Sequence, residues 1–274
     1  NTGFERITAA VSLDYKISDK LKLSSKVNYT NKQSDNLPAT GYNNQSISYF
    51  MIFQNPNVDL AWYAPRWKNG KYEIDQIHPF SSFIDNPYVI AYDMTNSLNN
   101  NQVVGNISAN YQISNKFDLM VRSGMDMSNE DRAQQRPFST ANFQSGYFKQ
   151  QNLTKYEINT DALLTYRDKL SSKFDLTASV GANTMSRKYN TVNGYVDGLV
   201  IPGTYKLSNG INAPTMSTIA QNKMVNSLYG LASLSFDSKI FLDLTGRNDW
   251  SSALPVQNNS FFYPSINTSA VISE

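Results

Sequence analysis

Strict alternation of apolar and polar side chains constrains this chain more than any other feature. In the stretch RITAAVSLDYKI, Ile7, Val11 and Leu13 fall on one face of an extended strand, and Ser12 and Asp14 fall on the other. The short turn SDK follows, and LKLSSKVNYT then alternates in the same way. A period of two residues is the pattern of a strand with one apolar and one polar face. The two stretches together predict a β-hairpin.

This hairpin pattern recurs along the chain. YKISDKLKL, which begins at Tyr15, is matched by YQISNKFDL, which begins at Tyr111. Looser repeats are TYRDKLSSKFDL and LSFDSKIFLDL. The repeats are unevenly spaced, which argues against a solenoid or a propeller. The repeated unit is a short turn between two long amphipathic strands.

Short and long connections alternate between the predicted strands. Short turns are predicted near residues 18–20, 114–116, 167–173 and 237–239, and long polar segments at 33–101, 129–152, 187–223 and 247–260. The predicted strands are 6–17, 21–31, 102–113, 117–128, 153–166, 174–186, 224–236, 240–247 and 261–273. This pattern is typical of an all-β, antiparallel transmembrane β-barrel with short periplasmic turns and long extracellular loops. A soluble antiparallel β-domain is the alternative.

The alternation also predicts which side chains face lipid and which face the lumen. Lipid contact is predicted for Leu23, Val27, Ile107, Leu164 and Leu176, and a lumenal position for Lys26, Asn110, Arg122 and Asp161. Tyrosines occur where three predicted strands meet short turns, a position that suits an aromatic belt at the periplasmic interface. These residues are Tyr15, Tyr111 and Tyr166.

Composition argues against several other classes of protein. Only 17% of residues are charged and the net charge is +2, which is too small for a nucleic-acid surface. Cys is absent, so the chain offers no disulfide framework and no thiolate metal site. The single histidine, His78, has no second His or Cys near it in the sequence. We find no catalytic constellation, and we expect neither an enzyme nor a bound cofactor or metal.

Several segments of the chain are long and specific enough to compare with known families. RNDWSSALP from Arg247 and FFYPS from Phe261 form the most specific pair, and NPY from Asn86, GLVIPGTYKLSN from Gly198 and the Y-x-I-S-[DN]-K hairpins accompany them. Together these segments resemble the SusC/RagA family of TonB-dependent outer-membrane transporters. The resemblance implies that residues 1–274 form part of a transmembrane barrel domain in the bacterial outer membrane. About nine strands of a larger, plugged barrel are then expected, with the plug domain, the TonB-contacting segment and the last barrel strands outside this sequence.

The resemblance also implies a function and partners. Such a chain is expected to form part of an importer for oligosaccharides or peptides, energised through the TonB complex and covered by a SusD-like surface lipoprotein. Outer-membrane lipid is an expected partner, and nucleic acid is not. A passive porin or a structural outer-membrane barrel is the alternative, and nothing in these residues separates the two without the resemblance.

Aromatic residues in the first long segment are the candidate contacts for a ligand or for the lipoprotein. They could stack on a sugar ring, pack against the lipoprotein, or form the core of the loop itself. The lipoprotein contact is expected to involve residues 46–95 and 190–222. The candidate residues are Trp62, Tyr63, Trp67 and Tyr72, together with Trp250 near the end of the chain.

The RNDW motif and the proline that follows it are interpreted as structural. Asp249 can brace the loop and Trp250 can pack over it. Pro264 lacks an N–H group, so it belongs near the start of a strand or at an edge. We therefore predict bracing rather than ligand contact for Arg247, Asp249, Trp250 and Pro264.

Overall fold

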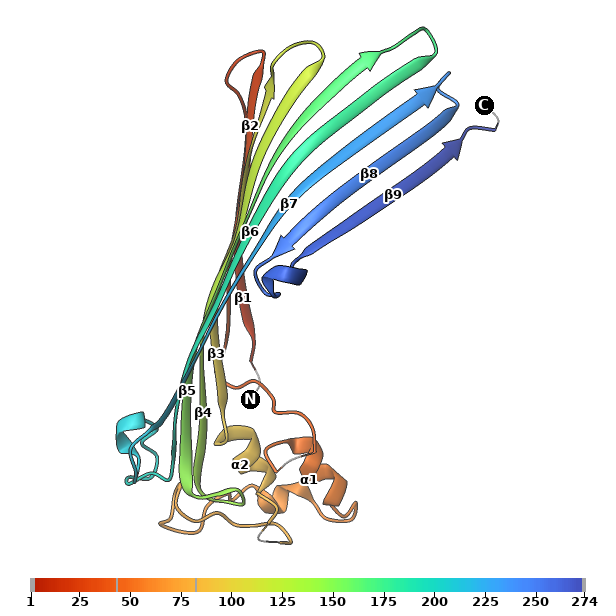
Figure 1. Ribbon diagram of the computed structural model, residues 1–274. Helices are drawn as coiled ribbons and strands as arrows, with labels where there is room; N and C mark the ends of the chain where they lie inside the picture. The colour runs from red at the N-terminus through yellow and green to blue at the C-terminus, as the bar shows by residue number, and fades with distance from the viewer. Residues whose placement is uncertain (1–2, 43, 82, 273–274) are drawn as a thin grey trace.

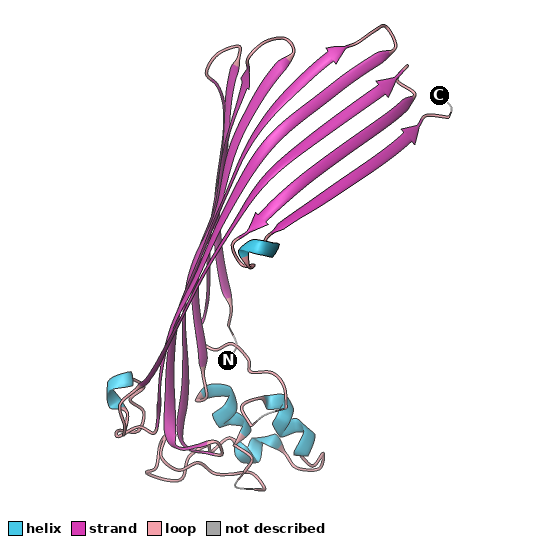
Figure 2. Ribbon diagram, viewed as in Figure 1, coloured by secondary structure: helices cyan, strands magenta, loops and turns pink. Residues whose placement is uncertain are grey.

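Nine antiparallel strands form one continuous sheet in chain order, which confirms the predicted fold class. The computed structural model describes residues 3–42, 44–81 and 83–272. The sheet is long, twisted and curved, and its connections alternate between a short-turn end and a long-loop end (Figures 1 and 2). The strands are β1 (Glu5–Lys16), β2 (Leu21–Ser34), β3 (Asn96–Gln112), β4 (Phe117–Thr140), β5 (Phe143–Lys169), β6 (Phe174–Asp197), β7 (Thr215–Phe236), β8 (Ile240–Ser251) and β9 (Ser260–Ala270). Residue 273 of the last predicted strand lies outside the described residues.

The strand register separates the two faces as the alternation predicts. Directly paired residues share a face, so the pairs Arg122–Asp161 and Asp161–Asn183 lie on one side of the sheet. Leu164 pairs with Leu119 and lies on the opposite side. The five residues predicted to contact lipid all share this second face, and the four predicted lumenal residues share the first. We call the first the polar face and the second the apolar face.

Aromatic rings mark the short-turn end of the apolar face. Tyr15, Tyr111 and Tyr166 all lie there on this face, at positions that suit the predicted belt. Phenylalanines extend this row across the sheet: Phe117 lies 4.9 Å from Tyr166 between ring centroids, and Phe174 lies 4.9 Å from Phe236. Rings with an apolar body and a polar tip are favoured where hydrocarbon meets headgroups.

All four predicted long segments run into strands at their ends, and two of them are wrong over most or about half of their length. Residues 129–152 lie almost wholly in β4 and β5, joined by a two-residue turn at Ala141 and Asn142. The segment 187–223 is a loop only at residues 198–214, because β6 and β7 continue on either side. Strands of 24 and 27 residues are far longer than the roughly 9–11 residues that cross a bilayer. Where both faces of a strand meet water, the apolar alternation that reveals the strand in the sequence disappears.

The connection between β2 and β3 folds into a small unit at the long-loop end, which we call the cap (residues 35–95). It contains α1 (Ile47–Phe53), the 3₁₀ turn η1 (Leu60–Tyr63) and α2 (Pro87–Tyr92). Side chains cap each helix start: Ser46 accepts a hydrogen bond from the Tyr49 N–H, and Asn86 from the Tyr88 N–H. Its core contains Phe50, Tyr63, Ile84, Val89, Ile90 and Met94.

Two further 3₁₀ turns interrupt the other long connections. They are η2 (Leu207–Asn209), between β6 and β7, and η3 (Val256–Asn258), between β8 and β9. No helix in the described ranges is both long and apolar enough to cross a membrane.

The two ends of the sheet are predicted to lie on opposite sides of the membrane. The chain has no Cys, so single cysteines introduced by Asn69→Cys in the cap or Asp19→Cys in the first short turn can be labelled at defined places. A membrane-impermeant maleimide should label N69C on intact cells and D19C only after the outer membrane is permeabilised. Labelling of D19C on sealed cells would show that the topology is the opposite of the predicted one.

Candidate functional site

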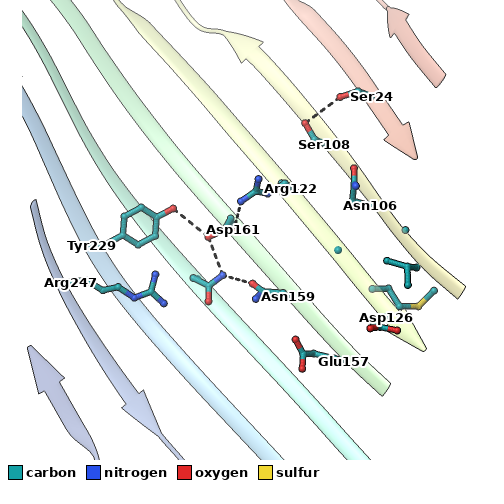
Figure 3. A pocket seen from close by; sticks show the side chains of 15 residues that line it. Ser24, Asn106, Ser108, Arg122, Asp126, Glu157, Asn159, Asp161, Tyr229 and Arg247 are labelled. Atoms are coloured by element: carbon teal, nitrogen blue, oxygen red, sulfur yellow. Dashed lines mark hydrogen bonds and ion pairs between the residues drawn. The ribbon is translucent and has the colours of Figure 1, made fainter. Parts of the chain in front are cut away.

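A network of polar side chains crosses the polar face between β4 and β7. Arg122 donates to Asp161 at 3.0 Å, and the Asn183 amide donates to the same carboxylate at 3.0 Å. The Tyr229 hydroxyl donates to Asp161 from the other side at 3.3 Å. Figure 3 shows Arg122 and Tyr229 directed to Asp161 from either side. Because paired strands place these groups on one face, the network follows from the register.

A hollow of about 820 Å³ lies over this network. Its lining contains both cationic and anionic side chains, so it suits a ligand or protein surface with mixed polar groups. Amide and hydroxyl groups between the charges add hydrogen-bond donors and acceptors without net charge. Lining side chains include Ser24, Asn106, Arg122, Asp126, Glu157 and Asp161.

The RNDW motif joins this network on β8. Arg247 donates to Asp249 at 2.6 Å and to the Ser227 hydroxyl at 2.8 Å. Its guanidinium lies 5.6 Å from the centre of the Tyr229 ring, within range of a cation–π interaction. Arg247 thereby links β8 to β7, a geometry that suits bracing; the bracing role itself stays a prediction.

Within this motif, the structure separates Trp250 from Arg247 and Asp249. Trp250 pairs with Asn226 and lies on the apolar face, on the far side of the sheet from Arg247 and Asp249. Pro264 lies in β9, where it pairs with Gly246 of β8. Among the described residues, β9 has only one neighbouring strand. Trp250 is therefore not brought together with the aromatic residues of the cap.

Glycine at position 181 makes room for the Tyr229 ring. The two residues are direct partners in β6 and β7, and a Cβ atom at position 181 would overlap the ring. The ring can therefore lie flat along the wall with its hydroxyl directed to Asp161. Sequence reasoning missed both residues, because a strand glycine shows its role only when its partner is known.

Replacing Gly181 with Ala is predicted to displace Tyr229 and to weaken the network. We expect a loss of about 1–3 kcal/mol in the free energy of unfolding, the usual cost of overpacking. Denaturant titration of the folded barrel in detergent measures this loss. Gly124→Ala is the matched control, since a Cβ there meets no atom closer than 3.7 Å. Adding Tyr229→Ala should remove the cost of G181A; an equal cost in both backgrounds would contradict the assignment.

The four aromatic candidates in the cap have different environments. Tyr63 is buried in the cap core, and Trp67 packs against it. Trp62 and Tyr72 are 69% and 63% exposed. The Trp67 and Tyr72 rings lie 6.0 Å apart in a T-shaped arrangement. Tyr63 and Trp67 therefore contribute to the cap's own core, while Trp62 and Tyr72 are available to a partner.

Buried polar contacts join the cap to the extended tip of β4 and β5. Gln76 donates to the Ser139 carbonyl at 2.6 Å and to Asp85 at 2.9 Å. The Ala141 N–H donates to Asp85 at 2.8 Å. Arg136 is 1% exposed and donates to Gln45, to the carbonyls of Thr95 and Gln135, and to Asn96. None of these residues belongs to a recognisable sequence motif, because the residues that they contact lie in a different segment of the chain.

Two carboxyl groups in the cap titrate at unusual pH. Burial raises the pKa of Asp85 to about 6, although the Ala141 N–H and the Gln76 amide act to lower it. Burial also raises the pKa of Asp93 to about 6, against the lowering effect of Arg66. Arg66 donates to Asp93 at 3.1 Å. Each carboxyl therefore keeps its proton to a higher pH in the folded cap than in the unfolded chain.

The cap is predicted to loosen as the pH rises. The stabilisation that comes from neutral Asp85 is complete below its ordinary pKa of 3.8 and is lost as the pH rises through about 6. Hydrogen exchange at residues 139–142, corrected for the intrinsic rate, should show more protection at pH 5 than at pH 8. Asp85→Asn keeps an acceptor oxygen but does not ionise, so its protection should vary less. Asp75→Asn, which removes an ion pair with Lys68, should keep the wild-type pH dependence.

That pH dependence can fail in a defined way. Equal protection of wild-type protein at both pH values would show that Asp85 does not control the docking of the cap.

The GLVIPGTYKLSN loop between β6 and β7 is held by its own contacts. The Asn209 amide donates to the carbonyls of Ile201 and Thr204 at 2.8 and 2.7 Å, and its oxygen accepts from the Ile201 N–H at 3.1 Å. Gly198 and Gly203 have φ angles of +99° and +71°, which favour glycine. The region 190–222 is thus strand at both ends, and only this compact loop remains for the predicted contact with a lipoprotein.

The described ranges contain no group of three or more His, Cys, Asp or Glu residues that could hold a metal ion. His78 lies within the cap, with Nδ1 3.2 Å from the Ile84 carbonyl oxygen.

The sheet, its two faces and its folded loops have the fold of a segment of the large β-barrels seen in solved outer-membrane transporters and receptors. Comparison of the sequence with protein-family models and with curated proteins gives no match. Comparison with solved structures gives close similarity to the RagAB peptide transporter. That match has a TM-score of 0.75 and 16% identity over 97% of this chain and 30% of the other. In its closed-closed state, the RagAB peptide importer matches with a TM-score of 0.77 and 18% identity.

A second group of structures shares the fold less closely. BauA, the ferric preacinetobactin receptor from Acinetobacter baumannii, matches with a TM-score of 0.54 and 12% identity over 99% of this chain and 38% of that chain. The chain thus spans about 30% of the RagAB chains that it matches. These likenesses confirm the fold that the resemblance to the SusC/RagA family predicts.

Proposed function

We propose that this chain forms part of the barrel wall of a TonB-dependent importer in the bacterial outer membrane. The observation that carries the proposal is the match to the RagAB peptide importer, with a TM-score of 0.77 over 97% of the chain. That match includes the cap as well as the strands, because the chain is covered almost throughout. The polar face, with its mixed charges, suits the inner wall of a barrel that admits polar solutes.

The proposal includes a larger barrel around this sheet. Among the described strands, β1 and β9 each pair on one side only. A strand edge in hydrocarbon would leave backbone N–H and C=O groups without partners, so further strands must complete the wall. The proposed domain assignment is therefore that residues 1–274 belong to the barrel domain. The plug domain and the TonB-contacting segment are proposed to lie in other parts of the protein.

We further propose a SusD-like lipoprotein as the partner of the cap and peptides or oligosaccharides as the cargo. The exposed rings of Trp62 and Tyr72 support a protein contact, because aromatic side chains are enriched at interface hot spots. The similarity of the fold to the RagAB peptide transporter favours peptides. Trp250 is no longer proposed as a contact of this interface, because it lies on the apolar face.

A passive porin is the second candidate, since a polar inner wall suits it equally well. Transport energetics distinguish the two functions. Uptake of the cargo by an importer stops when TonB is deleted or the proton gradient is collapsed, whereas diffusion through a porin continues. Uptake that survives both treatments would contradict the importer proposal.

Truncating the exposed cap aromatics is predicted to weaken the lipoprotein complex. Trp62→Ala with Tyr72→Ala should reduce co-purification in mild detergent by roughly 30-fold or more, if the pair contributes about 2 kcal/mol. The heat-modifiable mobility of the barrel should be unchanged, because both rings lie outside the cap core. Phe262→Ala is the matched control, since Phe262 is 65% exposed but lies on the apolar face.

Trp67→Ala provides an internal comparison. It should loosen the cap itself, because Trp67 packs against the core. If the double variant keeps the lipoprotein bound and loses only uptake, the exposed rings belong to the cargo site and the interface assignment is wrong.

A further inference from the structure

On the apolar face, the side chains of β2 to β5 are mostly apolar from the short-turn end up to one row, which we call the end of the apolar band. Beyond that row, toward the long-loop end, the side chains on the same face change abruptly in chemistry. The last apolar row across these strands is Tyr29, Val103, Met127 and Tyr156, linked by direct pairing. The next two rows on the same face contain seven uncharged polar residues and one carboxylate. We call these two rows the amide belt: Asn31, Gln33, Asn99, Asn101, Asn129, Asp131, Asn152 and Thr154.

Hydrogen bonds organise one half of the belt around Asn31. Its amide donates to the Asn99 oxygen at 3.0 Å and to the Asn101 oxygen at 2.9 Å. The Tyr29 hydroxyl, in the last row of the apolar band, also donates to the Asn101 oxygen at 2.7 Å. The oxygens of Asn99 and Asn101 are thereby engaged within the belt.

The other half of the belt is organised around Asn152. Its amide donates to Asp131 at 2.7 Å and to the Asn129 oxygen at 3.4 Å. The Thr154 hydroxyl also reaches the Asn129 oxygen at 3.4 Å. As in the first half, an asparagine side-chain oxygen, here that of Asn129, accepts hydrogen bonds from other residues of the belt.

This arrangement leaves amide N–H groups facing outward. The side-chain nitrogens of Asn99, Asn101 and Asn129 donate to no other group in the described part of the chain. Amides held by their oxygens are oriented donors, and they suit a ligand rich in acceptor oxygens. A phosphate would favour Arg or Lys, but the belt has neither, and Asp131 is its one charged residue. Hydroxyl and ether oxygens of a saccharide fit better.

We propose that the amide belt binds the saccharide headgroup of an outer-leaflet glycolipid. The belt is continuous with the apolar face, so the acyl chains and the headgroup of one lipid would contact adjacent rows. The belt contains no large apolar or aromatic side chain to anchor a protein partner. This inference rests on the proposed outer-membrane location. Cell fractionation and heat-modifiable mobility test that location separately from lipid binding.

The experiment counts glycolipids bound to the intact protein by native mass spectrometry after mild-detergent extraction. Asn99→Ala, Asn101→Ala and Asn129→Ala combined should lower glycolipid retention roughly five-fold or more, because three donors are lost. Gln102→Ala with Ser128→Ala is the matched control at the adjacent level of the polar face, and it should retain wild-type binding.

Three probes identify the part of the lipid that is recognised. Added glycolipid with its full saccharide should bind wild-type protein more strongly than the triple variant. A glycolipid with a truncated saccharide should bind both proteins equally weakly. A dephosphorylated glycolipid should still bind. Equal retention by the triple variant, or binding that follows the phosphate rather than the sugar, would overturn the proposal.

Discussion

The continuous antiparallel ladder is the constraint on which the rest of this structure depends. A bilayer offers no hydrogen-bond partners to backbone N–H and C=O groups, so each strand must pair along its whole length inside it. Unbroken pairing fixes the register between strands, and the register fixes which side chains share a face. The polar network around Asp161 exists because β4 to β7 pair without a slip.

The same ladder continues beyond the apolar band and supports the cap. β4 and β5 extend past the end of β3 as a narrow tip, and the cap docks on that tip through Gln76, Asp85 and Arg136. Burying a guanidinium and carboxyl groups is costly, and neutral acceptors and backbone groups offset much of that cost. The docking is therefore polar and directional, and it is predicted to weaken as the pH rises, whereas the cap's own core is apolar.

The aromatic residues have different roles at the short-turn end, on the polar face and in the cap. Rings at the short turns form a row on the apolar face, where an interface between lipid and water suits them. Tyr229 lies flat over Gly181 on the polar face and carries a hydrogen bond to Asp161. In the cap, Tyr63 is part of the core and Trp62 is exposed. One residue type thus contributes packing, orientation or contact area according to its surroundings.

The sequence by itself determined the number, order and faces of the strands, because a period of two is a local signal wherever one face is apolar. It also located the short turns and their tyrosines. Only the tertiary structure decided how far β4 to β7 extend, because strands with water on both faces lose that signal. It also decided that Trp250 lies apart from Trp62 and that Asp85 meets Ala141. Such contacts join residues from distant segments, and only the register and the docking of the cap bring them together.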